Sequence, residues 1–449
     1  MPCATYGAST LRPMSSSSGS VLLSSVPWVL MADSQAGVLR DVSILIRDGR
    51  IAEIGPDVAG DADVVIDASD TLVMPGLVNL HTHLPMTLLR GVAEDVDLQG
   101  FLERVWAEEA RVMNPGGVYA GARLGALESV LGGTTTALDM YFHPEDAHRG
   151  AVDVGLRHVT GPVFFSLPGP DGLSWDQRMD LARAWPSTLA DIGGPWVPPA
   201  LMPHAAFTVT PDNLRDVAEL ARAQGAIVHV HASENEKENE DTIRSTGLRP
   251  VEVLEETGNL ALRAILGHGV HLEDSEVELL ADRDCSVAHC PGSNLKLASG
   301  AADFVGYRRR GLRVGVGTDG CSSSNDLDMF MAMRLTAMLA RLVRDDPAAV
   351  SARDVVKAAT LDAAAALGMD DRIGSIEVGK EADLVVLDLR SPHLVPMRDP
   401  YTSMVFSAGR SDVRDVIIAG DVIVRDRRPV RVSADSIRSD ALVALEDPA

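Results

Sequence analysis

Short runs of alternating apolar and polar residues lie near both ends of the chain. Residues 42–47 and 50–54 alternate in this way, and the pair Asp48-Gly49 stands between them. An Asp-Gly pair between two such runs predicts a β-hairpin. Further runs predict more strands, so that one small β domain is assembled from both ends of the chain. They are residues 21–31, 382–388, 413–419 and 422–424, the last two joined by Gly420-Asp421.

Between these ends, strand patterns alternate with helical patterns. The clearest helix covers 211–224, with Thr210 as N-cap, Pro211 in the first position and Gly225 as the stop. Eight strands that alternate with helices predict a (β/α)8 TIM barrel, and an open doubly wound sheet is the alternative that the pattern leaves open. The predicted strands are 78–83, 134–141, 158–166, 197–204, 227–232, 264–271, 285–290 and 314–319.

The patterns therefore predict an α/β protein, a barrel with a small β-sandwich domain that is built from both chain ends. The Ser-rich residues 1–18 are expected to form a disordered tail. The β domain is assigned to 19–74 and 376–435, the barrel to 75–375, and a C-terminal tail to 436–449.

Composition narrows the class of protein. The 449 residues are 46% hydrophobic and 23% charged, which is usual for a globular protein. No apolar run is long enough to cross a bilayer, so no membrane span is expected. The formal net charge of −24 disfavours nucleic acid as a partner, because an acidic surface repels phosphates. We expect a cytoplasmic homo-oligomer that acts on a small molecule.

The four cysteines are Cys3, Cys285, Cys290 and Cys321, and they form neither a C-x-x-C pair nor a disulfide framework. Cys285 and Cys290, with His289 beside them, would suit a soft metal ion. Buried strand thiols are the favoured interpretation, because free cysteines are usually core residues.

Histidine and aspartate residues stand at the carboxyl ends of several predicted barrel strands. His81 and His83 are two positions apart and project from the same face of a strand. His231, His268 and Asp319 end three further strands. One such histidine alone is more often simply hydrogen-bonded. The joint pattern predicts a shared site, because the active sites of TIM barrels lie at these strand ends.

Three imidazoles and a carboxylate, with one position left for water, are typical of a catalytic zinc site. A zinc ion of this kind lowers the pKa of its bound water to about 7. No lysine ends a predicted strand, which argues against a site in which a carboxylated lysine bridges two metal ions.

The chain also resembles a known family over about residues 36–430. It is similar to the methylthioadenosine/S-adenosylhomocysteine deaminases of the amidohydrolase superfamily. The resemblance rests on the strings HTHLPMTLLRG (81–91), DMYF (139–142), SNLKLASG (293–300), GTDG (317–320) and IGSIEVGKEADL (373–384).

For the metal, the resemblance implies one ion per subunit, Zn²⁺, with Fe²⁺ or Mn²⁺ as alternatives. His229 and His231 lie on one strand face, and the family's H-x-x-E spacing, which Glu234 completes, selects His231. The implied ligands are His81, His83, His231 and Asp319.

For catalysis, the resemblance implies that Glu234 moves protons and that His268 polarises the attacking water together with Asp319. Ser323, four residues after Asp319, is expected to orient that ligand by a hydrogen bond. A carboxylate aimed at a ring nitrogen favours deamination over dechlorination.

Four residues resemble family positions near a nucleoside: Arg90, Trp106, Glu109 and His204. Glu109 would accept hydrogen bonds from ribose hydroxyls, His204 would contact the ribose or the base, and Glu234 would contact the purine ring. The alternatives are core packing for Trp106 and a solvated helix face for Glu109. The histidines expected to be structural are His143, His148, His158, His271 and His393. Among these and His289, the first to test are His271 and His289, because both lie near predicted strand ends.

One departure from the family concerns the carboxylate of S-adenosylhomocysteine, which the family binds with arginines. Pro162 stands in the corresponding stretch and cannot donate a hydrogen bond, and Arg178 is a substitute that the sequence does not place.

The predicted activity is hydrolytic deamination of an adenine-type nucleoside to the inosine-type product and ammonia. The substrates considered are methylthioadenosine, S-adenosylhomocysteine, adenosine and 5′-deoxyadenosine. Guanine, a pterin, cytosine or an s-triazine is the alternative within enzymes. A non-catalytic barrel that serves as an assembly protein is disfavoured because every ligand remains. A nucleic-acid deaminase is disfavoured by the charge and by the absence of an H-x-E…P-C-x-x-C arrangement.

Overall fold

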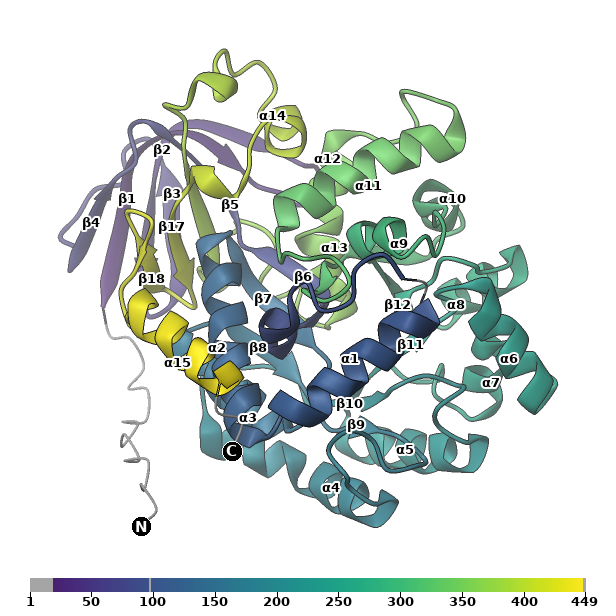
Figure 1. The fold of residues 1–449 in the computed structure, drawn as a ribbon. Coiled ribbons are helices and arrows are strands. Elements are labelled where there is room, and N and C mark those ends of the chain that lie inside the picture. The colour runs from purple at the N-terminus through teal and green to yellow at the C-terminus, as the bar shows by residue number, and fades with distance from the viewer. Residues whose placement is uncertain (1–18, 97, 447–449) are drawn as a thin grey trace, which may run out of the picture.

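The computed structural model describes residues 19–96 and 98–446, and the tail predicted at 1–18 lies outside them. Strands from both ends of the chain lie side by side in one nine-stranded sheet (Figure 1). Its order is β19-β18-β17-β16-β5-β1-β2-β3, with β4 beside β1. The strands are β1 (Ser20–Leu30), β2 (Val38–Arg47), β3 (Arg50–Gly55), β4 (Val64–Asp67), β5 (Thr71–Pro75), β16 (Leu384–Asp388), β17 (Val413–Ile418), β18 (Asp421–Arg425) and β19 (Arg428–Pro429).

The hairpin predicted at residues 42–54 is confirmed. Strands β2 and β3 pair antiparallel, and Asp48 and Gly49 take the left-handed turn with φ of 49° and 78°. Strands β17 and β18 form a second hairpin, but its two left-handed residues are Ala419 and Gly420. The turn lies one residue earlier than predicted, because Asp421 already pairs with Ile418 in the sheet.

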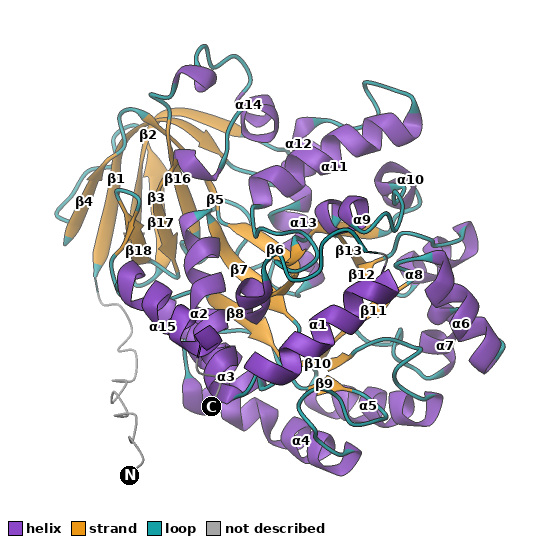
Figure 2. Ribbon diagram, in the orientation of Figure 1, coloured by secondary structure: helices purple, strands orange, loops and turns teal. Residues whose placement is uncertain are grey.

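The middle of the chain forms two sheets of parallel strands (Figure 2). One has the order β14-β13-β12-β11-β10-β9 and the other the order β15-β6-β7-β8. The strands are β6 (Leu77–His83), β7 (Thr134–Asp139), β8 (Arg157–Thr160), β9 (Val163–Phe164), β10 (Ala200–Pro203), β11 (Ile227–Ala232), β12 (Ala264–His268), β13 (Ser286–His289), β14 (Arg313–Val316) and β15 (Asp319–Gly320).

Helices surround these parallel strands (Figure 2). The predicted helix 211–224 is confirmed as α5 (Pro211–Gln224): the Thr210 hydroxyl accepts a hydrogen bond from the amide of Asn213, and Gly225 ends the helix with a φ of 62°. The other helices are η1 (Leu84–Leu89), α1 (Leu98–Val112), α2 (Pro115–Leu131), α3 (Pro144–Val154), α4 (Trp175–Ile192), α6 (Glu236–Thr246), α7 (Pro250–Glu256), α8 (Asp274–Asp282), α9 (Pro291–Lys296), α10 (Phe304–Arg309), α11 (Met329–Arg344), α12 (Ala352–Ala358), α13 (Leu361–Ala366), η2 (Pro392–Leu394), α14 (Pro400–Phe406), η3 (Arg410–Asp412) and α15 (Ala434–Glu446).

The segment assigned to a C-terminal tail, residues 436–449, is helical up to Glu446. Helix α15 lies along α2 (Figure 1), buries Ile437 and Ala441, and joins α2 through an ion pair of 2.9 Å between Asp440 and Arg123. This apolar contact makes the segment a packed helix rather than a tail.

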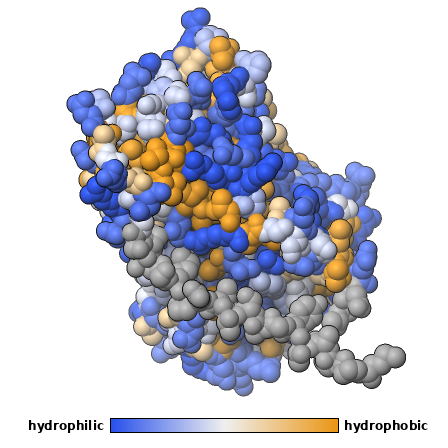
Figure 3. All heavy atoms as spheres, turned by 90° about the vertical axis from the view of Figure 1, so that its left-hand side faces the viewer, coloured by the Kyte–Doolittle hydropathy of each residue, from blue (hydrophilic) through white to orange (hydrophobic). Residues whose placement is uncertain are grey.

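Hydrophilic residues cover most of the face that carries the nine-stranded sheet, and hydrophobic residues gather in one band across it (Figure 3). Among residues 19–96 and 98–446, no helix combines the length and the apolarity that a membrane span requires.

Candidate metal centre and active site

The candidate site lies where the parallel strands end. His81 and His83 come from β6, His231 from β11, His268 from the last position of β12 and Asp319 from the first of β15. All five side chains are buried, with at most 9% of any residue exposed. Residues two apart on a strand share a face, so that β6 directs both of its imidazoles toward Asp319. The Nε2 atoms of His81 and His83 lie 3.4 and 3.2 Å from Asp319 Oδ1.

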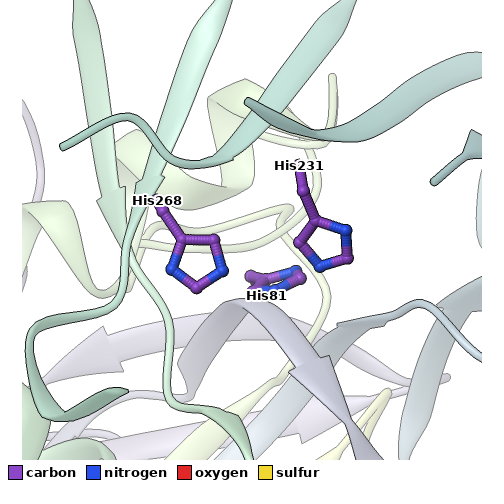
Figure 4. A group of neighbouring side chains, drawn as sticks. All are labelled: His81, His231 and His268. Carbon is purple, nitrogen blue, oxygen red and sulfur yellow. The ribbon is translucent and has the colours of Figure 1, made fainter. Parts of the chain in front are cut away.

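The donor atoms form two groups that share His81. One ligand atom each from His81, His231 and His268 lie within 4.8 Å of one another, and the same holds for His81, His83 and Asp319. Figure 4 shows the first three rings turned toward one another. The Nε2 atom of His81 is buried and has no hydrogen-bond partner among the described residues. Because an unpaired buried nitrogen is costly, this donor set fits a metal ion.

Backbone carbonyls orient two of these imidazoles. The Nδ1 atom of His83 donates to the carbonyl oxygen of Met140 at 2.6 Å, and that of His231 donates to the carbonyl oxygen of His204 at 2.9 Å. A proton on Nδ1 leaves the Nε2 lone pair free for a metal ion.

A third imidazole is oriented by a histidine chain. His81 Nδ1 lies 2.7 Å from His229 Nε2, and His229 Nδ1 lies 2.8 Å from the carbonyl oxygen of Ile265. The carbonyl can only accept, so His229 donates from Nδ1 and accepts at Nε2. His81 then carries its proton on Nδ1 and keeps Nε2 free.

Charge suits metal binding at two of the proposed ligands, whereas at a third, His83, Asp319 outweighs burial and raises the pKa to about 9, so that a metal ion would displace a proton there. Burial lowers the pKa of His81 to about 4, so that its ring is neutral at neutral pH. Burial alone would raise the pKa of Asp319, but the neighbouring imidazoles of His81 and His83 hold it well below its usual range. The Ser323 hydroxyl donates to Asp319 Oδ2 at 2.5 Å. A neutral imidazole and an ionised carboxylate are the forms that bind metals.

Glu234 lies beside the cluster, and its Oε2 atom is 3.8 Å from His268 Nε2. The preceding residue, Ser233, has a left-handed φ of 53°. The carboxylate of Glu238 fixes this turn by accepting hydrogen bonds from the amides of Ser233 and Glu234 at 3.1 and 2.7 Å. Burial raises the pKa of Glu234, so that its protonated form persists to higher pH than in water.

A cavity of about 350 Å³ opens above the cluster. Glu109 is only 3% exposed there and accepts a hydrogen bond of 2.7 Å from the Tyr141 hydroxyl. The His204 ring stacks on Phe165 with 4.6 Å between centroids, and Trp106 remains 40% exposed at the opening. Nine of the predicted site residues line this cavity, whereas His81 and Arg90 do not: His83, Trp106, Glu109, His204, His231, Glu234, His268, Asp319 and Ser323.

The family model of the amidohydrolases matches residues 72–423. This chain belongs to the amidohydrolase family. The 5′-deoxyadenosine deaminase of Methanothermobacter thermautotrophicus is 41% identical to this amidohydrolase over 393 residues, which cover 87% of this chain and 91% of that protein. The 5-methylthioadenosine/S-adenosylhomocysteine deaminase of Moorella thermoacetica is 38% identical over 399 residues, 88% of this chain and 92% of that protein.

A solved structure is similar over nearly the whole fold. The crystal structure of an adenosine deaminase from Xanthomonas campestris, with bound zinc, has a TM-score of 0.91 and 36% identity. The match covers 95% of this amidohydrolase and 98% of that chain.

Other residues singled out in the sequence belong to neither group of converging ligand atoms. Arg90 is paired with Glu128 and does not line the cavity. The thiols of Cys285, Cys290 and Cys321 are free and buried, and Cys3 lies outside the described residues. Among the described residues, the groups able to hold a metal ion both contain His81, so Cys285, His289 and Cys290 form no second centre.

The remaining histidines have local roles in this amidohydrolase. His158 lies 2.8 Å from a carboxylate oxygen of Asp139 and 3.1 Å from His148. His271 bonds to the carbonyl oxygen of Ser299. His393 pairs with Asp412, His143 precedes α3, and both ring nitrogens of the buried His289 lack a partner among the described residues.

Sequence reasoning missed His229, Tyr141, Asn294 and Glu238 as supporting residues. Asn294 accepts from His268 Nδ1 at 2.9 Å and so orients that ring. Tyr141 and Asn294 lie inside strings that carried the family resemblance, and His229 shares a strand face with His231, so those signals could have identified them. Glu238 gave no comparable signal, because its partners are backbone amides.

Replacing His229 should weaken metal binding. We expect His229→Leu to lower zinc affinity roughly 10- to 100-fold, because His81 loses the acceptor that fixes its Nδ1 proton. His229→Gln, whose amide oxygen still accepts, should lose less. Competition with a chromophoric chelator measures the affinity, and His393→Gln serves as the control. If the parent protein, the two His229 variants and the His393→Gln control all bound zinc with equal affinity, His229 would have no role in orienting His81.

Proposed function

We propose that this amidohydrolase removes the exocyclic amine of an adenine-type nucleoside by hydrolysis, with one zinc ion per subunit. The observation that carries the proposal is Glu234, a buried carboxylate next to His268 in the wall of the cavity. In its protonated form, a carboxyl group there can donate a proton to the ring nitrogen beside the carbon that bears the amine. The names of the relatives and the zinc in the similar adenosine deaminase support the same reaction.

The ligands proposed for the ion are His81, His83, His231 and Asp319. When bound, a zinc ion supplies a Lewis acid that activates water at neutral pH. His268 and Asp319 take up and orient the proton of the attacking water. Ser323 keeps the Asp319 carboxylate in place through its hydrogen bond.

Glu234 completes the proton transfers. It donates a proton to the ring nitrogen, which makes the neighbouring carbon a better electrophile. The C–O bond forms at that carbon, and the proton taken from water passes to the amine. The C–N bond then breaks and ammonia leaves, while the remaining O–H proton returns to Glu234 and the oxygen becomes the carbonyl of the inosine-type product.

The ribose is proposed to face Glu109. This carboxylate has room for further donors, because only one of its oxygens accepts from Tyr141. Trp106 and His204 provide flat walls for the base and the sugar.

This arrangement makes nucleoside binding depend on pH. Burial raises the pKa of Glu109 to about 7, and only the ionised form accepts hydrogen bonds at both oxygens. Below about pH 7, kcat/KM for adenosine should therefore fall more steeply than kcat/KM for 2′,3′-dideoxyadenosine, which lacks both hydroxyls. Glu109→Gln should remove this difference. Parallel pH profiles for the two nucleosides in the parent protein would contradict the assignment.

We also propose that the two parallel sheets are arcs of one closed (β/α)8 barrel. Strands β14 and β15 follow each other directly along the chain but belong to different sheets, and the same holds for β8 and β9. Each of these pairs therefore connects an edge strand of one sheet with an edge strand of the other. In the β domain, β1 changes register between Leu23 and Val26 and pairs with β4 before and β5 after that point. A sheet that bends there can enclose a core as a sandwich does.

A substrate panel tests the proposed reaction. Zinc-loaded protein should release ammonia from adenosine, 5′-deoxyadenosine and methylthioadenosine with kcat/KM well above the values for guanine, cytosine and an s-triazine. If kcat/KM were higher for guanine, cytosine or the s-triazine, that compound would be the substrate in place of an adenine-type nucleoside.

A further inference from the structure

A second cavity of about 700 Å³ continues from the candidate active site. The rings of Trp106, Phe165 and Phe207 line both cavities. Trp106 and Phe207 are 40% and 44% exposed, which is unusual for side chains of this size. The loops after β9 and β10 and the end of α6 supply the remaining walls. Apolar surface left open beside a catalytic cavity is typical of a ligand subsite.

The polar groups of the second cavity are largely engaged within the protein. Ser166 Oγ accepts hydrogen bonds of 2.7 Å from both the Thr210 amide and the Asn213 side chain. The Thr208 hydroxyl donates to the carbonyl oxygen of Ala205 at 3.1 Å. Pro211 occupies the first turn of α5 and has no N–H to offer. A polar ligand group would therefore find few donors here.

The lining of the second cavity contains no charged side chain among the described residues. A buried cation beside this lining is Arg178, whose guanidinium lies 5.6 Å from the centroid of Phe165. It donates to Asp171 Oδ2 at 2.8 Å and to the carbonyl oxygen of Val163 at 2.9 Å, and its side chain is 2% exposed. Because Asp171 neutralises the guanidinium of Arg178, this arginine is not available to bind the carboxylate of a ligand.

The geometry of the first cavity determines how the nucleoside is oriented in it. This orientation rests on the proposed function. The carbon that bears the amine faces the metal ligands, and the ribose faces Glu109. The 5′ carbon then points away from the cluster, toward Trp106 and Phe207, where the second cavity begins.

We propose that the second cavity binds a bulky, uncharged, apolar group carried on the 5′ carbon. The substrate class is then adenosine with a 5′-alkylthio or arylthio substituent longer than methylthio. The volume of about 700 Å³ leaves room for a chain of several carbons. S-Adenosylhomocysteine is a poor substrate, because burying its charged amino-acid end without partners is costly.

A chain-length series tests this inference on the zinc-loaded full chain. The value of kcat/KM should rise from 5′-methylthio- through propylthio- to hexylthioadenosine, by about two- to fourfold per methylene, the upper value corresponding to about 0.8 kcal/mol per buried CH₂. S-Adenosylhomocysteine should give the lowest value. Equal values along the series, or the highest value for S-adenosylhomocysteine, would overturn the inference.

Filling the cavity should remove the gain. Ser245 lines the cavity from the end of α6, and Ser245→Trp should reduce the hexylthio-to-methylthio ratio at least tenfold. Glu240→Trp, an exposed position of the same helix outside the cavity, should keep the parent ratio. If Ser245→Trp does not fold, Leu167→Asp tests the same wall, since a charge there should lower the ratio too. An unchanged ratio in the folded variant would contradict the proposed binding mode.

Failure of the proposed reaction gives a different result. Loss of turnover for every nucleoside, adenosine included, would overturn the deaminase proposal. Calorimetric titration with 5′-hexylthioinosine, the product form, tests the cavity without turnover. Binding tighter than that of 5′-methylthioinosine, with a more negative heat-capacity change, supports apolar burial in the second cavity. Equal affinities would count against it.

Discussion

Glu234→Gln is expected to lower kcat for adenosine-type substrates by roughly 10² to 10⁴ while the protein keeps its metal ion. Glutamine has nearly the same shape but cannot carry a proton between the ring nitrogen and the leaving amine. The Glu234 carboxylate is 15% exposed and lies 3.8 Å from His268 Nε2. Burial raises its pKa, which favours its action as an acid near neutral pH.

Glu236→Gln is the matched control for this prediction. Glu236 lies two residues further along, and its side chain is 83% exposed. The same substitution there should leave kcat, KM and metal content at parent values. Parent-like turnover in Glu234→Gln would remove the proton transfer assigned to Glu234. Loss of metal from that variant would instead place Glu234 among the ligands.

His81→Ala should abolish stable metal binding and lower kcat/KM by roughly 10⁴, because the Lewis acid contributes several kcal/mol and each 1.36 kcal/mol is a factor of ten. His81 belongs to both groups of converging ligand atoms, and its buried Nε2 atom has no other partner among the described residues. Without His81, two separate pairs of ligand atoms remain, one from His231 and His268 and one from His83 and Asp319.

The matched control is His393→Ala, since the His393 side chain is 49% exposed and bonds to Asp412 instead. Metal analysis after gel filtration should give about one zinc ion per chain for the control and less than a tenth of that for His81→Ala. Full occupancy in His81→Ala would contradict the assigned ligand set. Thermal unfolding of both variants separates loss of the ion from loss of the fold.

Local patterns predicted most of the secondary structure because the signals that define it are short. The hairpin turn at Asp48-Gly49 and the caps of α5 need a few neighbouring residues. The predicted strand 158–166 is instead divided at Gly161 and Pro162 into β8 and β9. A side chain at Gly161 would meet the carbonyl oxygen of Ala200 at 1.7 Å, and Pro162 offers no amide to a ladder.

The cluster of histidines and Asp319 was predictable because its members lie at or near the carboxyl ends of predicted parallel strands, and such ends lie together at one edge of a sheet. Contacts between segments that lie far apart in the sequence were not predictable in this way. The acceptor of His81 is His229, 148 positions away, and the donor to Glu109 is Tyr141, from another element. Helix α15 was missed for the same reason, since α2, which covers its apolar face, lies some three hundred residues earlier.

The convergence of separate strands on one ion is tested most directly by a crystal structure of the zinc-loaded protein with anomalous data above and below the zinc edge. One peak per chain is expected, at about 2.0–2.2 Å from His81, His83, His231 and Asp319. A map with no peak among these four side chains, or with them too far apart to share one ion, would contradict the account.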